Sequence, residues 1–250
     1  MINFKSIVFL FTLFIWQYSN TQNEFQGKIS YTIQVTNINF SKIANDSTKS
    51  IEVKNMFNKI FKDAKPIVAV LIFENNESLY ELDLIKEMEI ENDSKINLTK
   101  IMARDGKYYM NNATKEILHE ENFVGDMFLI KYQPKNWKIT QETKRIGNYS
   151  CYKAITISKA KDKKGNEVDK IIEAWYTPEI PINFGPKEYN GLPGLILEVQ
   201  EGKLNIVASK IELNTKEAIV IEKPKRGKKI TKEEFKQITK EAASSIFWKN

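Results

Sequence analysis

Residues 175–199 read Trp-Tyr-Thr-Pro-Glu-Ile-Pro-Ile-Asn-Phe-Gly-Pro-Lys-Glu-Tyr-Asn-Gly-Leu-Pro-Gly-Leu-Ile-Leu-Glu-Val. This segment contains four of the seven prolines and three of the ten glycines of the chain. Proline removes a backbone donor and glycine weakens regular structure, so this density excludes a helix and a continuous central strand. We therefore predict a long, stiffened connection between two strand-like segments. The residues concerned are Pro178, Pro181, Pro186, Pro193, Gly185, Gly191 and Gly194.

Two interpretations of this connection are open. Pro193 presets φ and Gly194 tolerates a positive φ, which is typical of a type II turn. A connection of about 17 residues without regular structure is unusual in a compact domain, and such connections are enriched in function. Its aromatic and aliphatic side chains either line a ligand- or partner-binding site or plug one end of a sheet. The candidate site residues are Trp175, Tyr176, Pro178, Ile180, Pro181, Phe184, Gly185, Pro186, Tyr189, Gly191, Leu192, Pro193 and Gly194.

Strand patterns dominate the rest of the chain. Apolar and polar residues alternate from Ile29 to Val35, which is typical of a half-buried strand. Asn75 and Asn76 separate two further strand patterns and predict a hairpin. Strands that follow one another through short turns favour an antiparallel meander over alternating strand–helix units. The predicted strands span 28–36, 67–73, 78–84, 107–110, 115–120, 126–132, 137–143, 149–158, 170–177, 195–199, 203–213 and 217–221.

Two segments carry helical periodicity instead. Apolar residues recur at helical spacing in residues 50–64, and their stripe predicts a helix that packs on the sheet. Thr231 followed three residues later by Glu234 is a capping box, and the apolar stripe after it predicts a closing helix. A basic run precedes this helix, and Pro224 and Gly227 within it predict a linker. The run consists of Lys223, Lys225, Arg226, Lys228, Lys229 and Lys232.

The chain divides into three expected parts. Residues 1–21 have a basic start, an apolar run from Ile7 to Trp16 and a polar exit, which is typical of a secretory signal peptide. This run of roughly 10 residues is shorter than the about 20 that a membrane span needs. Residues 22–222 are expected to form the antiparallel β domain, and residues 223–250 the basic linker and terminal helix. No later segment is apolar enough to span a bilayer, so we expect an exported protein.

The chain is basic, with a formal net charge of +6 at pH 7. A basic run can bind nucleic acid, but an exported protein leaves the compartment where nucleic acid is found, so we expect none as a partner. The run instead suits a peripheral contact with an acidic envelope surface. A solubilising linker explains it equally well.

The side chains that catalyse reactions most often are scarce. His119 is the single histidine and Cys151 the single cysteine, so the spacings that mark zinc sites are absent. No Gly-x-Ser-x-Gly turn, phosphate-binding glycine loop or dinucleotide fingerprint occurs. Cys151 lies in a predicted strand, where a buried, inert thiol is expected. We therefore expect no cofactor, no metal and no catalytic residues, with an unrecognised hydrolase built on His119 or Cys151 as an alternative.

Carboxylates are numerous, but abundance does not make a catalytic pair. General acid–base chemistry needs two carboxyl groups held at a set distance in a cleft. A solvated strand face is the simpler explanation for those beside the histidine and around the Pro/Gly connection. They are Glu120, Glu121, Glu173, Glu179, Glu188 and Glu198.

The hexapeptide Gly191-Leu-Pro-Gly-Leu-Ile196 resembles the motif that names the GLPGLI family of exported Bacteroidetes proteins. The resemblance extends upstream through residues 175–181 and Gly185-Pro186, and to residues 147–154. It implies a location in the periplasm or cell envelope of a Gram-negative bacterium. It implies no catalytic residue, because the family has no established biochemical role.

These observations predict a mainly β (α+β) fold, a curved antiparallel sheet or open half-barrel with one packed helix and a C-terminal helix. The first functional hypothesis is a non-catalytic envelope protein that binds an apolar ligand or an extended chain on the concave face of the sheet. The second is an interaction subunit of an envelope assembly that docks an envelope protein through the closing helix.

Overall fold

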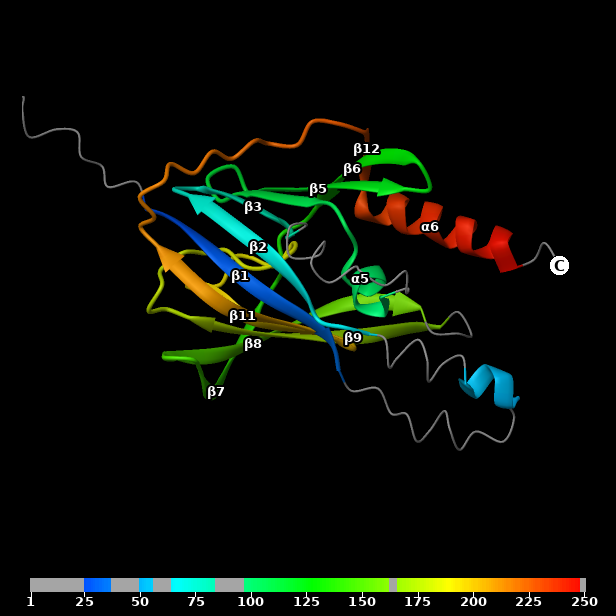
Figure 1. Cartoon of the computed structure of the whole chain (residues 1–250), viewed down its shortest axis with the longest axis horizontal. Helices are drawn as coiled ribbons and strands as arrows, with labels where there is room; N and C mark the ends of the chain where they lie inside the picture. The colour runs from blue at the N-terminus through cyan, green and yellow to red at the C-terminus, as the bar shows by residue number, and fades with distance from the viewer. Residues whose placement is uncertain (1–24, 37–49, 56–63, 84–96, 162–165, 248–250) are drawn as a thin grey trace, which may run out of the picture.

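The computed structural model describes residues 25–36, 50–55, 64–83, 97–161 and 166–247, and the expected signal peptide lies outside them. A mixed sheet that does not close into a barrel dominates the fold, as predicted (Figure 1). Its strand order is β12-β6-β5-β4-β3-β2-β1-β11-β10-β9-β8-β7. The strands are β1 (Gln26–Val35), β2 (Ile67–Glu74), β3 (Glu77–Leu82), β4 (Lys107–Asn111), β5 (Glu116–Phe123), β6 (Asp126–Tyr132), β7 (Lys138–Ile146), β8 (Tyr149–Lys161), β9 (Glu167–Thr177), β10 (Leu195–Glu201), β11 (Leu204–Leu213) and β12 (Lys228–Thr231).

Side-chain alternation places the core on one face of this sheet, which we call the inner face. Ile29, Tyr31 and Ile33 of β1 are buried, and every second residue of β2 is buried as well. Because strand side chains alternate between faces, these residues pack together on the inner face. The hairpin predicted at the two asparagines is confirmed: β2 pairs with β3, and Asn75 adopts a positive φ of 51°.

Two antiparallel meanders meet at β1. The strands β1 to β6 pair in chain order, and so do β7 to β11. Strand β1 joins the two by pairing with β2 on one side and β11 on the other. The first strand of the described chain therefore holds both halves of the sheet together, although its partner β11 is distant in sequence.

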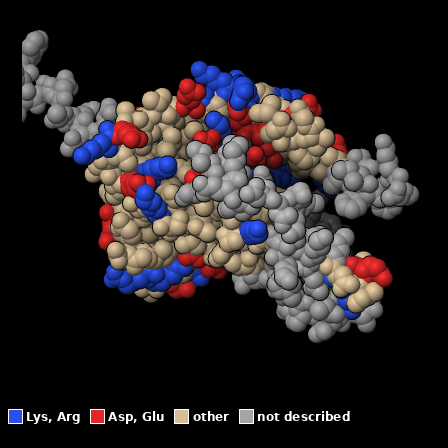
Figure 2. All heavy atoms as spheres, in the orientation of Figure 1, with Lys and Arg blue, Asp and Glu red and all other residues tan. Residues whose placement is uncertain are grey.

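The basic run differs from its prediction. Residues 228–231 were expected in a linker, but they form β12, which pairs in parallel with β6 at the edge of the sheet. The strand predicted for residues 217–221 is absent from the described structure; that segment is a bend followed by residues without regular secondary structure. The backbone NH of Arg226 donates to the Glu120 carboxylate at 3.3 Å, which ties the run to β5. In Figure 2, basic side chains gather along the margin where the segment leading to β12 runs in Figure 1.

The helices also depart in part from expectation. Helix α5 (Leu98–Ala103) was not predicted; it is short, and the Asn97 side chain caps it by accepting from the Thr99 NH at 3.0 Å. Of the helix expected at 50–64, residues 50–55 and 64 are described; residues 51–55 are helical and exposed or half-buried, whereas residues 50 and 64 are not helical. Most of its apolar stripe, residues 56–63, lies outside the described residues. No helix in the described ranges is long and apolar enough to cross a membrane.

Helix α6 (Lys232–Phe247) confirms the predicted closing helix and its capping box. The Thr231 NH donates to the Glu234 carboxylate at 2.7 Å, and the Glu234 NH donates to the Thr231 hydroxyl at 3.2 Å. Phe235 is buried against Phe128 of β6, with ring centroids 5.4 Å apart. The Lys236 ammonium donates to the Lys159 carbonyl of β8 at 3.4 Å. Helix α6 therefore spans the opening between the two ends of the curved sheet (Figure 1).

Candidate functional site

The Pro/Gly connection folds back along the start of β10. The Leu195 NH donates to the Ile180 carbonyl at 2.9 Å, and the Ile196 NH donates to the Phe184 carbonyl at 3.0 Å. The indole NH of Trp137 donates to the Asn190 carbonyl at 2.7 Å and fastens the far side of the segment. We call residues 178–194 the plug segment, because backbone bonds hold it in place and its side chains fill two hydrophobic clusters.

The candidate residues from the sequence separate into these two clusters and an exposed set. Ile180 and Phe184 belong to the main core on the inner face, against which Trp175 packs. Tyr176, Tyr189 and Leu192 belong to the second cluster. Gly185, Pro186 and Gly194 are buried, whereas Pro178, Pro181, Gly191 and Pro193 are exposed. The structure thus brings the apolar members together as packing groups and leaves three of the four prolines at the surface.

A row of aromatic side chains crosses the inner face toward the plug segment. Tyr31, Tyr80, Tyr108 and Tyr132 come from β1, β3, β4 and β6, and successive ring centroids lie 6.0 to 6.3 Å apart. We call these four residues the tyrosine row. Burial raises the pKa of each phenol well above its usual value, so all four stay protonated and each hydroxyl keeps a hydrogen to donate.

Within the tyrosine row, the hydroxyls of Tyr31 and Tyr80 differ in their hydrogen bonding. The Tyr31 hydroxyl donates to the Ile196 carbonyl at 2.7 Å. The Tyr80 hydroxyl is buried and has no hydrogen-bond partner among the described residues. A buried polar group without a partner costs about 1 to 3 kcal/mol, so the Tyr80 hydroxyl is an unused donor within the core.

His119 of β5 stacks on Tyr108, with centroids 3.8 Å apart and planes 7° apart. Its Nε2 lies 3.2 Å from the Asp105 carbonyl, which can only accept, so Nε2 carries the proton. Its Nδ1 lies 3.5 Å from the Glu121 carboxyl. Burial lowers the pKa of His119 to about 3, and burial raises the pKa of Glu121 despite the nearby Arg104. The imidazole is therefore neutral near pH 7.

His119 predicts a pH dependence of stability. Its folded pKa of about 3 lies below the unfolded value of 6.5, so its contribution is full above pH 6.5 and is lost as pH falls toward 3. In His119→Gln, we expect the slope of unfolding free energy against pH between 6 and 4 to fall by about 1.4 kcal/mol per pH unit. Urea unfolding at several pH values measures this slope. Equal slopes in the two proteins would contradict the assignment, whatever their absolute stabilities.

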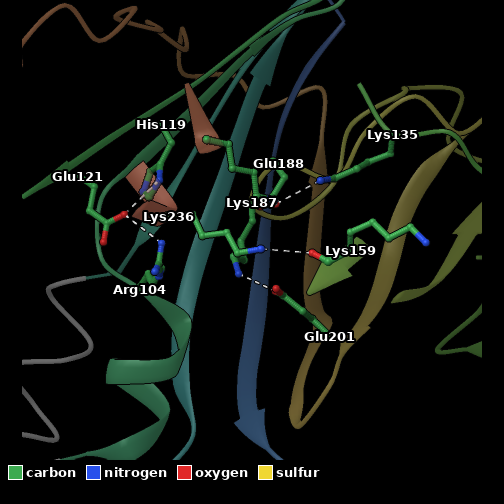
Figure 3. Close-up of polar contacts among 10 residues, drawn as sticks. Arg104, His119, Glu121, Lys135, Lys159, Lys187, Glu188, Glu201 and Lys236 are labelled. Atoms are coloured by element: carbon green, nitrogen blue, oxygen red, sulfur yellow. Dashed lines mark hydrogen bonds and ion pairs between the residues drawn. The ribbon is translucent and has the colours of Figure 1, made fainter. Parts of the chain in front are cut away.

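Charged side chains meet beside Tyr132, the last member of the tyrosine row. Figure 3 shows Lys135, Lys187, Glu188 and Glu201 of this group. The Glu188 carboxylate of the plug segment lies 3.4 Å from the Lys135 ammonium and 3.1 Å from the Lys232 ammonium. Lys187 pairs with Glu201 at the end of β10, at 2.7 Å. We call these five residues the lysine cluster. The plug segment, the β6–β7 connection, β10 and α6 all contribute to it.

Three side chains of the lysine cluster are buried, and the other two are partly exposed to solvent. The side chains of Lys135, Lys187 and Glu188 are 15%, 8% and 5% exposed, whereas Lys232 and Glu201 are 39% and 38% exposed. Burial opposes ionisation of Glu188, but the three neighbouring ammonium groups outweigh it and hold its pKa well below its usual value. Burial also lowers the pKa of Lys135, which Glu188 only partly offsets. Ammonium groups thus outnumber carboxylates in a desolvated site.

The lysine cluster also contacts aromatic rings. The Lys232 ammonium lies 4.7 Å from the Tyr132 ring centroid, and the Lys135 ammonium lies 5.5 Å from that of Tyr189. Burial raises the pKa of Tyr189, and the charges of Glu201 and Glu188 raise it further. Glu201 also acts electrostatically on Tyr80 and Tyr108. The lysine cluster therefore adjoins the tyrosine row at Tyr132.

Sequence reasoning missed this region. Glu120, Glu121 and Glu188 were expected on a solvated strand face, and this is wrong because all three are buried. Lys187 and Glu188 lie within the plug segment, whose prolines and glycines predicted an irregular connection. Charged residues in such a connection normally face water, so nothing in the sequence was a reason to expect their burial. Tyrosines at apolar positions of four predicted strands were a usable signal, because they share the inner face with the buried aliphatic residues.

The two residues considered for catalysis lie far apart in the sheet. His119 is on β5 and Cys151 is on β8, near opposite ends of the strand order. Cys151 is buried as predicted, and burial raises the pKa of its thiol to about 11, which keeps it protonated and a poor nucleophile. Among the described residues, no group of three or more His, Cys, Asp or Glu side chains is placed to hold a metal ion.

Comparisons with known proteins give a family match of limited extent. Residues 137–170 and 156–198 match the profile of a family described as "Protein of unknown function (Porph_ging)", which is consistent with a Bacteroidetes protein. The match covers β7, β8, β9, the plug segment and the first four residues of β10. No curated protein matches the chain.

Two similar solved structures are those of PNGF-II in C2 and P21 space groups. Each is 14% identical to this chain, and the alignments cover 86% of this chain with TM-scores of 0.49 and 0.48. The chain spans about a third of the length of those structures, with 32% and 33% of each covered. Sequence and structure together therefore indicate a β-rich protein related in part to a family of unknown function.

Proposed function

We propose that this chain is a non-catalytic binding protein of the bacterial envelope, of the GLPGLI type, and that its plug segment carries part of the binding site. The export assignment rests on the signal-peptide pattern of residues 1–21, and the family assignment rests on the hexapeptide 191–196. The ligand is a small molecule or chain end that enters beneath α6 and contacts the inner face of the sheet. This location replaces an open concave face, because Ile180 and Phe184 pack there in the core.

The observation that carries the proposal is the desolvated, partly reachable lysine cluster. Burying charges costs several kcal/mol for each ion, and apolar residues of similar size stabilise a core at least as well. Clusters of this kind occur more often at functional sites than in ordinary cores. The exposed margin formed by Lys232 and Glu201 supports entry from solvent, and the tyrosine row supports contact with an apolar ligand body.

Native mass spectrometry of the protein purified from its own cells tests the proposal. We expect a bound species that is released on denaturation and is depleted in Lys187→Met. This variant leaves Glu188 paired with Lys135 and Lys232 and leaves the partly exposed Glu201 to water. Lys159→Met is the matched control, because Lys159 belongs to a surface ion pair with Asp169 on β8 and β9. Equal ligand content in all three proteins, or none in the wild type, would refute the site.

A second measurement uses a dansyl-labelled undecanoic acid and its methyl ester, titrated into wild-type protein. Saturable binding of either probe, weakened in Lys187→Met and unchanged in Lys159→Met, supports a site for molecules with an apolar body. Fluorescence that rises linearly without saturation for both probes would contradict it.

A further inference from the structure

The donors and acceptors of the lysine cluster do not balance. Lys135, Lys187 and Lys232 contribute three ammonium groups, and Glu188 and Glu201 contribute two carboxylates. Glu188 is shared between two of the lysines. Each ammonium carries three donor hydrogens and no acceptor, so the cluster has an excess of both positive charge and donors.

The most buried groups of the cluster carry a net positive charge. Among the three cluster residues that are at most 15% exposed, two are cationic and one is anionic. Each lysine has a carboxylate partner, and Glu201 and Glu188 raise the pKa of Lys187 despite its burial. The cluster still holds one more ammonium than carboxylates, and one further anion would balance that excess. Solvent counter-ions reach Lys232 and Glu201 at the margin more easily than they reach Lys135 and Lys187.

An independent observation comes from the tyrosine row. Residue Tyr80 is 3% exposed, and its hydroxyl has no hydrogen-bond partner in the described parts of the chain. The charge of Glu201 helps to raise the pKa of Tyr80. The neighbouring Tyr108 ring packs edge-on against Tyr80, and the charges of Glu188 and Glu201 help to raise the pKa of Tyr108. The Tyr80 ring contacts Tyr108, the Tyr108 ring contacts Tyr132, and the Lys232 ammonium lies 4.7 Å from the Tyr132 centroid. The Tyr80 hydroxyl thus belongs to the row that adjoins the lysine cluster, and it offers a donor that the described residues do not use.

From this excess we propose that the lysine cluster and the Tyr80 hydroxyl bind the oxyanion group of a small organic ligand, either a carboxylate or a phosphate monoester. The ammonium groups of Lys135 and Lys187 supply charge-assisted hydrogen bonds, and Tyr80 supplies a neutral one. Lys232, the first residue of α6, completes the site from the open side. This inference rests on the proposed function and names the chemistry of its ligand.

Isothermal titration calorimetry with hexanoate, phenyl phosphate and neutral hexanamide tests the inference. We expect saturable binding of at least one anion, at least about 10-fold tighter than hexanamide, because a charge-assisted hydrogen bond is worth roughly 1.5 to 3 kcal/mol. Tighter hexanoate identifies a carboxylate ligand, and tighter phenyl phosphate identifies a phosphate monoester. Hexanamide binding equal to both anions would overturn the anion assignment while leaving a binding function intact.

Variants separate binding from stability. Lys187→Met should weaken the preferred anion about 10-fold, and Lys159→Met should leave it unchanged. Tyr80→Phe removes a hydroxyl that has no partner among the described residues, so its thermal stability should equal or exceed that of the wild type. The same variant should bind the anion about 5-fold more weakly, because one neutral hydrogen bond is worth about 1 kcal/mol. Unchanged affinity in both Tyr80→Phe and Lys187→Met would overturn the proposal, and so would no saturable binding of either anion.

Discussion

Glu188→Gln is expected to lower the free energy of unfolding by about 3 to 5 kcal/mol, because it leaves buried ammonium groups without their carboxylate. The Glu188 side chain is 5% exposed, and its carboxylate lies 3.4 Å from the Lys135 ammonium and 3.1 Å from the Lys232 ammonium. Glutamine keeps the shape and one acceptor but removes the charge. Lys135 then has no ion-pair partner among the described residues, and burial already disfavours its charged form. Urea denaturation of both proteins at pH 7 measures the difference.

The matched control is Glu142→Gln, which removes the same charge at an exposed position. Glu142 is 61% exposed and pairs with Lys153 at 3.3 Å. A surface pair of this kind contributes about 0 to 1 kcal/mol, so its loss should be small. Adding Lys135→Met to Glu188→Gln should recover part of the lost stability, because it removes one uncompensated ammonium. A cost for Glu188→Gln no larger than that for Glu142→Gln would show that Glu188 is hydrated in solution.

Gly194→Ala is expected to destabilise the fold by about 4 kcal/mol or to prevent folding, at the large end of single-substitution effects. Gly194 has a φ of +149°, and a Cβ at this position would overlap the carbonyl oxygen and carbon of Thr177. Both obstacles are backbone atoms, which a side-chain rotation cannot move. The close approach fixes where the plug segment ends and β10 begins, so relief would require the segment to shift.

Gly191→Ala is the control within the same hexapeptide. Gly191 has a φ of +86°, and no atom lies within 4 Å of the position that a Cβ would take. Its cost should therefore be limited to backbone strain, about 1 to 2 kcal/mol. Thermal unfolding of the two variants separates conformational strain from steric overlap. Equal destabilisation by the two substitutions would show that the plug segment does not press against β9 in solution.

The lysine cluster joins several elements that are distant in the sequence. Its members come from the plug segment, the β6–β7 connection, β10 and the first turn of α6. The cluster thus connects the two meanders with the helix that spans their opening. A ligand that balances its charge would also stabilise the docking of α6 through Lys232, by the mass-action term that accompanies any binding to the folded state.

Local patterns explain why most of the sheet was predictable. The alternation from Ile29 to Val35 and the Asn75-Asn76 turn follow from backbone geometry that involves only neighbouring residues. The capping box at Thr231 and Glu234 is equally local, and it forms as expected. Burial of Cys151 follows from its place in a strand. Short segments, such as β12 and α5, have too few residues for a periodic pattern, so they were missed.

The sequence by itself determined a mainly β protein, the positions of most strands and the closing helix, because each depends on residues close together in the chain. Only the tertiary structure decided that β12 joins β6 in parallel and that Lys135, Lys187 and Glu188 are buried together. Burial of a charge depends on which distant segments cover it, and no local pattern records that. The candidate site is therefore a property of how the plug segment and α6 close over the sheet.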